Sequence, residues 1–337
     1  MGKWILYFGL VTSLPASSIY WSSATAPPSS LGLDCALSLN DSGTAVGYVG
    51  GQAAETSISS LAVVLLGAPG SYSMAVDINN SGQIAGTYET QNGYQYAFYW
   101  SPSSGTVLLG TLGGSMSLST AIDSAGQIVG QSLDNSGNLA AFMWSSGSGI
   151  SKIGDSASET ATAINDSGEI GYEEDPPPYG SEDGAVGGTS SLSLLNFGGL
   201  GSTICAINDN GWIVGYTASG QGFLWTSSGI VDFGTSFIPE DINDSGEVLG
   251  SYQGQPAVWT ESGGFQFLDL GSYTNVIATH INDNGQIVGD ATAVPEPSAL
   301  ILCLAGVLLI AAGWRRRIRA GATHSEPSPP LPPEPPR

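Results

Sequence analysis

The hydrophobic positions of this chain recur in short alternating runs, separated by turn-forming residues. One nine-residue pattern returns seven times: an apolar residue, Asn-Asp-Ser-Gly or a close variant, Gln or Glu, an apolar pair and Gly. The copies start at Leu39, Ile78, Ile122, Ile164, Ile207, Ile242 and Ile281. Their starts are separated by 39, 44, 42, 43, 35 and 39 residues. A bounded period of this kind predicts a repeat architecture with loops of variable length.

Each copy predicts a β-hairpin. Asn and Asp side chains cap tight turns, and the Gly accepts the positive φ of a type I turn followed by a G1 bulge. The flanking apolar residues, such as Ile242 and Val248, alternate with small or polar ones as strands do. The last residue of the pattern, as at Gly215, Gly250 and Gly289, indicates a close backbone approach or a bend.

Two more strands are expected between successive hairpins. One is aromatic: "AFYW" at 97–100, "AFMW" at 141–144, "GFLW" at 222–225 and "AVW" at 257–259. The other contains Leu-Gly: "LLGTLGG" from Leu108, "LLNFGGLG" from Leu194, "VDFG" from Val231 and "LDLG" from Leu268. Four strands in about 40 residues are the signature of a β-propeller blade.

The two ends of the repeat region complete each other. The seventh hairpin, at Ile281, lacks its two later strands, whereas "IYW" at 19–21 and "LGL" at 31–33 precede the first hairpin. We therefore expect an all-β, seven-bladed β-propeller over residues 18–293, with one blade built from both termini. Closing the ring in this way would remove exposed sheet edges.

Composition narrows the possible functions. Only 11% of residues are charged, and 48 are Gly, as in a turn-rich β protein. The basic residues are Lys3, Lys152, Arg315, Arg316, Arg317, Arg319 and Arg337. Lys152 is thus the one cationic side chain between Trp4 and Trp314, which argues against nucleic acid binding. Such a body would attract Ca²⁺, but a solvated acidic surface that keeps the protein soluble is the favoured explanation of the charge.

The two ends carry targeting features. Residues 1–17 combine Lys3, an apolar stretch and small residues, as a secretory signal peptide does; a buried N-terminal strand is the alternative. Residues 299–314 form an apolar segment slightly shorter than the ~20 residues that span a bilayer as a transmembrane helix. The arginines that follow predict that everything before Pro295 lies outside the cytoplasm.

The second of these ends resembles the PEP-CTERM sorting signal. The residues that carry the resemblance, within 294–319, are Val294, Pro295, Glu296, Pro297 and Ser298, the apolar segment, and Arg315, Arg316 and Arg317. The resemblance implies that exosortase, a membrane protease-transferase, cuts near Pro-Glu-Pro, and that the chain is exported by a bacterium that makes exopolysaccharide. Members of the family usually end soon after the arginines. Here a Pro-rich tail of disordered composition follows at 320–337, which could hinder processing or be an extension of the reading frame. A plain membrane anchor is the alternative.

The repeats resemble the bacterial "extracellular repeat, HAF family". Residues 109–114, 122–130 and 141–144 match its "LGTLGG" strand, "INxxGQIVG" hairpin and "HAFLW" strand. The family's His is absent, since Tyr96, Ala140 and Gln221 stand in its place. The resemblance implies an extracellular, propeller-like protein and no settled activity.

Candidate binding chemistry is sparse. The Asn-Asp-Ser-Gly turns lack the EF-hand spacing, so turn capping explains them without a metal. Asn40, Asn165 and Asn243 also begin glycosylation triplets, which the turn produces by itself. The fourth repeat gathers acidic residues around a Pro-rich loop, a weak candidate for Ca²⁺ or for a functional loop; a solvated insertion is the alternative. These residues are Glu173, Glu174, Asp175, Glu182 and Asp183.

Catalytic groups are few. The repeat region has one histidine, His280, and one lysine, so a Ser-His-Asp triad is not expected and a multi-His metal site cannot be assembled. His280 is expected only to fill a strand position. A carboxylate pair for glycoside cleavage remains open. Cys35 and Cys205 could form a disulfide or remain free.

These observations predict an exported surface or matrix protein whose propeller binds or scaffolds without catalysis. Exosortase is the expected processing enzyme, residues 299–314 the membrane contact before cleavage, and exopolysaccharide or surface proteins the partners. No cofactor is expected. The alternatives are a carboxylate-dependent carbohydrate-active enzyme and a membrane-tethered sensor.

Overall fold

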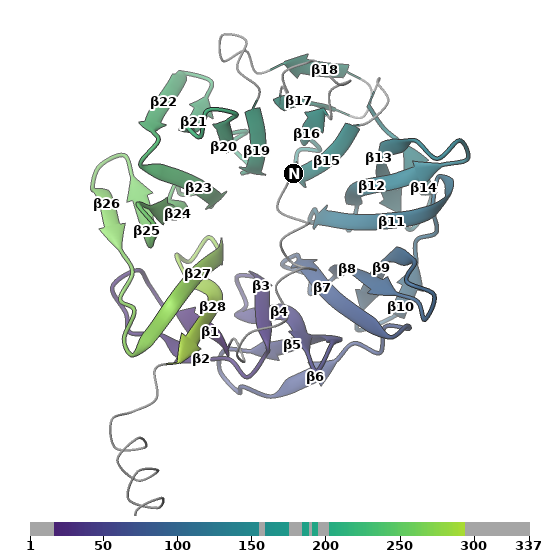
Figure 1. Ribbon diagram of the computed structural model, residues 1–337, viewed down its shortest axis with the longest axis horizontal. Helices are drawn as coiled ribbons and strands as arrows, with labels where there is room; N and C mark the ends of the chain where they lie inside the picture. Colours follow the sequence, from purple (N-terminus) through teal and green to yellow (C-terminus); the bar gives the residue numbers. More distant parts are fainter. Residues whose placement is uncertain (1–16, 155–158, 175–183, 189–190, 195–201, 294–337) are drawn as a thin grey trace, which may run out of the picture. The chain divides into compact units, whose positions relative to one another are not determined.

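The computed structural model describes residues 17–154, 159–174, 184–188, 191–194 and 202–293. Contacts divide the chain into two units, Met1–Ala293 and Val294–Arg337, and the second lies wholly outside the described residues. Within the first unit, seven four-stranded antiparallel sheets form a ring around a central axis (Figure 1). The predicted seven-bladed propeller is therefore confirmed.

Six blades follow the chain from the central axis outward. Blade 1 contains β3 (Cys35–Leu39), β4 (Thr44–Val49), β5 (Gln52–Ser57) and β6 (Val63–Leu65). Blade 2 contains β7 (Tyr72–Ile78), β8 (Ile84–Glu89), β9 (Gln95–Ser101) and β10 (Gly105–Leu108). Blade 3 contains β11 (Gly113–Ile122), β12 (Ile128–Asp134), β13 (Leu139–Ser145) and β14 (Gly149–Lys152). Blade 4 contains β15 (Glu159–Ile164), β16 (Ile170–Glu174), β17 (Gly184–Gly188) and β18 (Ser191–Leu194). Blade 5 contains β19 (Ser202–Ile207), β20 (Ile213–Thr217), β21 (Gly222–Thr226) and β22 (Gly229–Gly234). Blade 6 contains β23 (Phe237–Ile242), β24 (Val248–Tyr252), β25 (Gln255–Thr260) and β26 (Gly264–Phe267).

The seventh blade closes the ring with strands from both ends of the repeat region. Its order is β27 (Tyr273–Ile281), β28 (Ile287–Ala293), β1 (Ser17–Trp21) and β2 (Ser29–Ser30), from the axis outward. β1 pairs with β28 from Ser17 opposite Ala291 to Trp21 opposite Ile287. The indole of Trp21 is fully buried, and its Nε1 donates to the carbonyl of Asp269 at 2.7 Å. The expected closure by "IYW" is confirmed.

The core lies between neighbouring blades. In one such interface, Val46 and Ala53 of blade 1 pack with Ala75, Ile84 and Phe98 of blade 2. Each of these side chains is at most 1% exposed. Because each blade buries its apolar face only against the next blade, the ring stabilises the repeats collectively.

The outer strands differ from the prediction. "VDFG" lies in β22, but β10 ends at Leu108, β26 ends at Phe267, and residues 31–33 follow β2. A Leu just beyond the outer strand is instead a buried anchor; it begins a Leu-Gly pair at Leu31, Leu66 and Leu109, whereas Leu268 precedes Asp269. The N–H groups of Leu31, Leu66, Leu109 and Leu268 donate to the third strand of the blade at 3.0 to 3.1 Å. The Leu-Gly pairs predicted to form strands therefore mark the end of these strands.

The fourth blade has no aromatic third strand. Its third strand is β17, with the sequence Gly-Ala-Val-Gly-Gly, and only Leu194 of the expected "LLNFGGLG" strand lies in β18. The rest of that stretch, residues 195–201, lies outside the described residues. The described residues contain no helix long and apolar enough to cross a membrane. The apolar segment 299–314 lies outside them.

Candidate functional site

The repeated hairpin turn has the geometry predicted from its residues. In the first copy, the N–H of Gly43 donates to the carbonyl of Asn40 at 3.0 Å, and the N–H of Asn40 donates to the carbonyl of Thr44 at 3.1 Å. Gly43 has a φ of 79°. Oδ1 of Asn40 also accepts the N–H of Thr44 at 2.9 Å. The Asn side chain therefore caps its own turn, and no metal is needed to hold the turn.

The same Asn side chains join neighbouring blades. The amide Nδ2 of each donates to the main-chain carbonyl at the equivalent position of the next blade: Asn40 to Asn79 at 3.1 Å, Asn79 to Asp123 at 2.8 Å, Asn165 to Asn208, Asn208 to Asn243 and Asn243 to Asn282 at 3.0 Å, and Asn282 to Asn40 at 3.1 Å. One link is missing, because Asp123 of the third blade has no amide donor to offer Asn165. The Asn side chains that begin glycosylation triplets, at Asn40, Asn165 and Asn243, are at most 4% exposed and donate within this ring. The folded ring therefore leaves no accessible acceptor at these residues.

A second ring of contacts lies one residue further along the turns. In six of the seven blades, a carboxylate or amide accepts the N–H at the equivalent position of the preceding blade; the third blade has Ser124 there. These contacts, at 2.7 to 3.0 Å, are Asn80 from Asp41, Asp166 from Ser124, Asp209 from Asp166, Asp244 from Asp209, Asp283 from Asp244, and Asp41 from Asp283. Burial raises the pKa of Asp209 and Asp244, and the neighbouring carboxylates raise it further. The ring is thus a concentrated band of negative charge at one end of the central channel.

All seven inner strands contain a β-bulge immediately before the turn. The extra residues are Leu37, Val76, Thr120, Thr162, Cys205, Glu240 and Thr279. The residues that follow them are Ser38, Asp77, Ala121, Ala163, Ala206, Asp241 and His280. All of these residues line the central channel. A bulge changes the direction of side chains relative to a regular strand, so these positions supply the side chains of the channel wall.

The bulges also explain the last Gly of the repeat. A Cβ added to Gly215, Gly250 or Gly289 would collide with the inner-strand carbonyl of Thr203, Ile238 or Ile277, respectively. The predicted close backbone approach is confirmed at these positions.

The inner strands enclose a cavity of about 520 Å³ along the axis. Its polar wall has two regions: one contains Ser38, Asp77, Asp241 and His280, and the other contains Glu173, Thr203, Cys205, Tyr216 and Glu240. No Lys or Arg lines the cavity within the described part of the chain. The channel is therefore the most developed candidate site.

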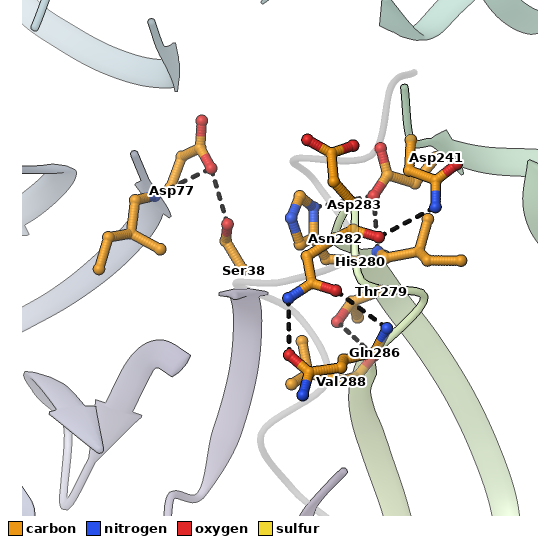
Figure 2. A network of polar contacts seen from close by, with 12 residues as sticks. Ser38, Asp77, Asp241, Thr279, His280, Asn282, Asp283, Gln286 and Val288 are labelled. Atoms are coloured by element: carbon orange, nitrogen blue, oxygen red, sulfur yellow. Dashed lines mark hydrogen bonds and ion pairs between the residues drawn. The ribbon is translucent and has the colours of Figure 1, made fainter. Parts of the chain in front are cut away.

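His280 and Asp241 form an ion pair in this wall (Figure 2). Nδ1 of His280 lies 2.8 Å from Oδ2 of Asp241, which also accepts the N–H of Ile281 at 2.8 Å. Burial disfavours the imidazolium, but the Asp241 carboxylate, with Asp77 and the carbonyl of Leu39, raises the pKa of His280 to about 9. His280 lies in β27, as expected, and in addition its side chain faces the channel and contacts Asp241.

Asp77 forms a matching contact on the opposite side of blade 1. Its Oδ1 accepts the hydroxyl of Ser38 at 2.7 Å (Figure 2). Its Oδ2 accepts the N–H of Ile122 at 2.9 Å. Burial raises the pKa of Asp77, against the lowering effect of His280 and of these hydrogen bonds. Ser38, Asp77 and Ile122 belong to blades 1, 2 and 3, so this carboxylate fixes three neighbouring blades in register.

The second polar region centres on Tyr216. Thr203 donates from Oγ1 to Oε1 of Glu173 at 3.2 Å. Burial raises the pKa of Tyr216, and Cys205, Glu173 and Glu240 raise it further by their charges. These groups come from β16, β19, β20 and β23, and sequence reasoning did not bring them together.

The acidic residues of the fourth repeat do not lie in a described cluster. Glu173 and Glu174 end β16, and Glu173 faces the channel through its contact with Thr203. Asp175, Glu182 and Asp183 lie outside the described residues. Among the residues that are described, no three His, Cys, Asp or Glu side chains converge as a metal site. The predicted cation site thus stays a prediction.

Cys35 and Cys205 are not joined by a disulfide. Cys35 donates from Sγ to Oδ2 of Asp290 at 2.8 Å, and Asp290 also accepts the N–H of Ala36 at 3.0 Å. Burial raises the pKa of the Cys35 thiol far above its usual range. Of the two possibilities that the sequence left open, the structure has the one without a disulfide between these two residues.

Comparisons with known proteins address the fold and the sorting signal. The β-propeller domain of the Trilobed protease from Pyrococcus furiosus, described as having an open velcro topology, is similar with a TM-score of 0.53 and 10% identity, over 72% of this chain and 82% of that one. Putative TolB from Agrobacterium tumefaciens has a TM-score of 0.48 and 10% identity, over 84% and 100%. At 10% identity, the similarity to the Trilobed protease domain shows only that the two chains share a fold. No curated protein matches the sequence.

A family model described as the PEP-CTERM protein-sorting motif matches residues 293–317. The match covers the Pro-Glu-Pro stretch, the apolar segment and Arg315, Arg316 and Arg317, and so confirms the predicted signal. The protein is a seven-bladed β-propeller that carries a PEP-CTERM protein-sorting motif, the signal of exported proteins processed by exosortase.

Proposed function

We propose that the propeller is an exported, surface- or matrix-associated binding or scaffolding body without catalytic activity, with exopolysaccharide or other surface proteins as its partners. The observation that carries the proposal is the sorting motif at 293–317, which begins where β28 ends at Ala293. The sequence resemblance to HAF repeats supports an extracellular role. The two rings of contacts between blades support a rigid body suited to presenting a fixed surface.

The state of His280 supports a non-catalytic role. A general base must accept a proton at the working pH. Asp241 raises the pKa of His280 to about 9 and occupies its Nδ1, so the imidazole is already protonated at neutral pH. Lys152 is the only other cationic side chain among the described residues, and it lies in the outer strand β14.

One observation favours a second candidate function. Glu173 and Glu240 both line the channel near Tyr216. Two carboxylates facing one cavity are the minimum set for glycoside hydrolysis. A carbohydrate-active enzyme would therefore use these two residues.

The test incubates the purified full-length protein with exopolysaccharide from its host and measures co-sedimentation and chain length. We expect retention of the protein with polysaccharide of unchanged length. Shortened chains that Glu173→Gln abolishes would replace the proposal with the enzymatic alternative. Absence of retention would remove exopolysaccharide as the partner.

A second measurement addresses localisation. Mass spectrometry of the C-terminal peptide, from membrane and extracellular fractions, is expected to show an end within residues 294–298 in the extracellular or surface fraction. An uncut chain held in the membrane would support a tethered sensor instead.

A further inference from the structure

A second cavity lies between blades 6 and 7, which are neighbours in the ring (Figure 1). Its volume of about 410 Å³ lies within the usual range of ligand pockets, roughly 300–1,000 Å³. Blade 7 contributes Ser23, Ala24 and Thr25, from the segment 22–28 that connects β1 to β2. This segment is longer than the connection between the third and fourth strands of any other blade. The closing blade therefore adds a wall to this interface that the other blades are too short to supply.

The repeat itself shows how this space is left open. Trp212 of blade 5 and Glu247 of blade 6 occupy the same position of the hairpin pattern. A Cβ added to Gly246 of the next blade would lie 2.6 Å from the indole of Trp212, and one added to Gly285 would lie 3.1 Å from Oε2 of Glu247. Both side chains thus cover the turn Gly of the following blade. The carboxylate is much smaller than the indole, so blade 6 leaves room where blade 5 fills it.

The charges on the wall argue against an ionic ligand. Its carboxylates are Glu247 and Asp283, and no Lys, Arg or His lines it in the described part of the chain. Oε2 of Glu247 accepts the Nδ2 amide of Asn243 at 2.8 Å, and Oδ1 of Asp283 accepts the N–H of Asp244 at 2.8 Å. An anion would meet no opposite charge here, and each carboxylate already has a donor from the protein. Two carboxylates are also too few for a metal site of carboxylate ligands.

The uncharged polar groups of the wall suit hydroxyls. Oγ1 of Thr260 accepts the N–H of Gly263 at 3.0 Å, which leaves its hydroxyl hydrogen to donate. The side chains of Ser245 and Gln266 also line the cavity and make no hydrogen bond to a described residue. Hydroxyl and amide groups both donate and accept, as the hydroxyls of a ligand do. A wall of this kind selects a ligand by its hydroxyl groups.

We propose that the cavity between blades 6 and 7 binds a neutral sugar residue of an oligosaccharide or polysaccharide. Its hydroxyls donate to Glu247 and accept from Thr260 and Gln266, and the C–H groups of its ring face the apolar side chains of Val258 and Ile281 in the wall. The inference rests on the proposed function and deepens it, because it assigns the polysaccharide contact to one interface of the ring.

Isothermal titration calorimetry of the full-length protein tests the ligand class. The probes are neutral trisaccharides of glucose, of galactose and of mannose, an anionic trisaccharide of galacturonic acid, and spermidine. We expect at least one neutral trisaccharide to bind, and neither the galacturonic acid trisaccharide nor spermidine to bind as tightly. Binding of no neutral trisaccharide would overturn the proposal, and so would tighter binding of either charged probe.

Glu247→Trp locates the binding, because it places in blade 6 the residue that blade 5 carries at the same position. The indole should fill the cavity and reduce the affinity below detection. The fold should persist, since Trp212 keeps the same main-chain contact to Asn208, at 2.9 Å, that Glu247 makes to Asn243. The melting temperature of the variant checks this. The matched control is Gln83→Trp, the same change at the equivalent position of blade 2, which should leave the affinity unchanged.

Glu247→Gln tests the hydrogen bond separately from the space. Gln83 and Gln286 stand at this position in other blades, and each accepts the amide of its own turn Asn, at 2.7 and 2.8 Å, so this variant should fold normally. It should weaken binding only several-fold, because a neutral acceptor forms a weaker hydrogen bond than a carboxylate. Equal loss of binding in Gln83→Trp and Glu247→Trp would place the ligand elsewhere and overturn the proposal.

Co-sedimentation with host exopolysaccharide separates this inference from the proposed function. The inference expects Glu247→Trp to lose both the trisaccharide and the polysaccharide. Persistent co-sedimentation of this variant would mean that the polysaccharide binds at another surface, so the inference would fail while the proposed function stands. Loss of co-sedimentation in the unmodified protein would instead remove exopolysaccharide as the partner.

Discussion

His280 and Asp241 join the innermost strands of blades 6 and 7 through a contact of 2.8 Å between Nδ1 and Oδ2. The two residues occupy the same position of successive repeats, directly after the bulge and before the apolar residue of the turn. The seventh blade also contains both ends of the repeat region, so this ion pair ties the closing blade to its neighbour from the channel side.

The ion pair should make the free energy of unfolding fall as the pH becomes alkaline. The pKa of His280 is raised from 6.5 to about 9, so the folded state binds the proton more tightly than the unfolded state. The resulting stabilisation is fully present below about pH 6.5 and is lost as the pH rises through about 9. We expect it to amount to at most roughly 3 kcal/mol. Urea unfolding at pH 6, 8 and 9.5 measures it.

His280→Gln serves as the comparison for that measurement, because it removes the titrating group and keeps a polar side chain in the wall. The difference in unfolding free energy between the two proteins should shrink from pH 6 to pH 9.5. If the difference in unfolding free energy were the same at every pH, the ion pair would have no part in the pH dependence of stability.

The carboxylate of Asp290 should make stability change with pH in the opposite direction to an ordinary carboxylate. Burial raises its pKa to about 6, more than the hydrogen bonds from Cys35 and Ala36 lower it. The folded state therefore holds a proton that the unfolded state has lost between about pH 4 and pH 6, and stability falls as the pH rises through this window. Asp290→Asn keeps the acceptor for the N–H of Ala36 and removes the charge. We expect a gain of about 1–3 kcal/mol at pH 7.5, measured by denaturant unfolding. A loss of stability would show that the carboxylate is needed as such.

Asp123 interrupts the ring of Asn side chains, and Asp123→Asn should complete it. The new amide would donate to the carbonyl of Asn165, as Asn79 does to Asp123 itself. One buried hydrogen bond contributes about 1 kcal/mol, and removing a buried charge adds to the gain. The melting temperature should rise by a few degrees. The reverse change, Asn243→Asp, should lower it. An unchanged melting temperature in both variants would contradict a contribution of this ring to stability.

Gly250 is required by the bulge opposite it. A Cβ at this position would collide with the carbonyl of Ile238, so Gly250→Ala should destabilise the protein by about 2–4 kcal/mol. Gly147→Ala is the matched control, because Gly147 is exposed and nothing lies within 4 Å of its added Cβ. Thermal unfolding of both variants checks the prediction, which fails if they melt together.

The features that sequence analysis predicted correctly are those set by neighbouring residues. The turn at Asn40 follows from the capping by its own side chain and the positive φ of Gly43. The number of blades follows from the number of such turns. The outer strands were placed less well, because the buried anchors such as Leu109 look like strand residues when only their hydrophobicity is considered.

The channel wall could not be predicted in the same way. Its side chains come from different repeats, whose starts are 35 to 44 residues apart, and a bulge places them, which simple alternation does not reveal. A signal was nevertheless present. In the aligned repeats, the position before the apolar turn residue is Ala in three copies, but it is Asp77, Asp241 and His280 in three others. Polar residues at a repeated inner position indicate a specific role. Asp123 likewise stands out as the one copy without Asn.

The position of β28 has a mechanical consequence. This strand is the last of the ring, yet it lies second in its blade, hydrogen-bonded to β27 on one side and to β1 on the other. A pulling force applied to the chain at residue 294 therefore loads two ladders of hydrogen bonds at once, and neither can peel away alone. A propeller held by its C-terminal end while its partners are dragged by flow would resist extraction at that end. Cleavage after Ala293 would release the tether without removing any strand from the ring.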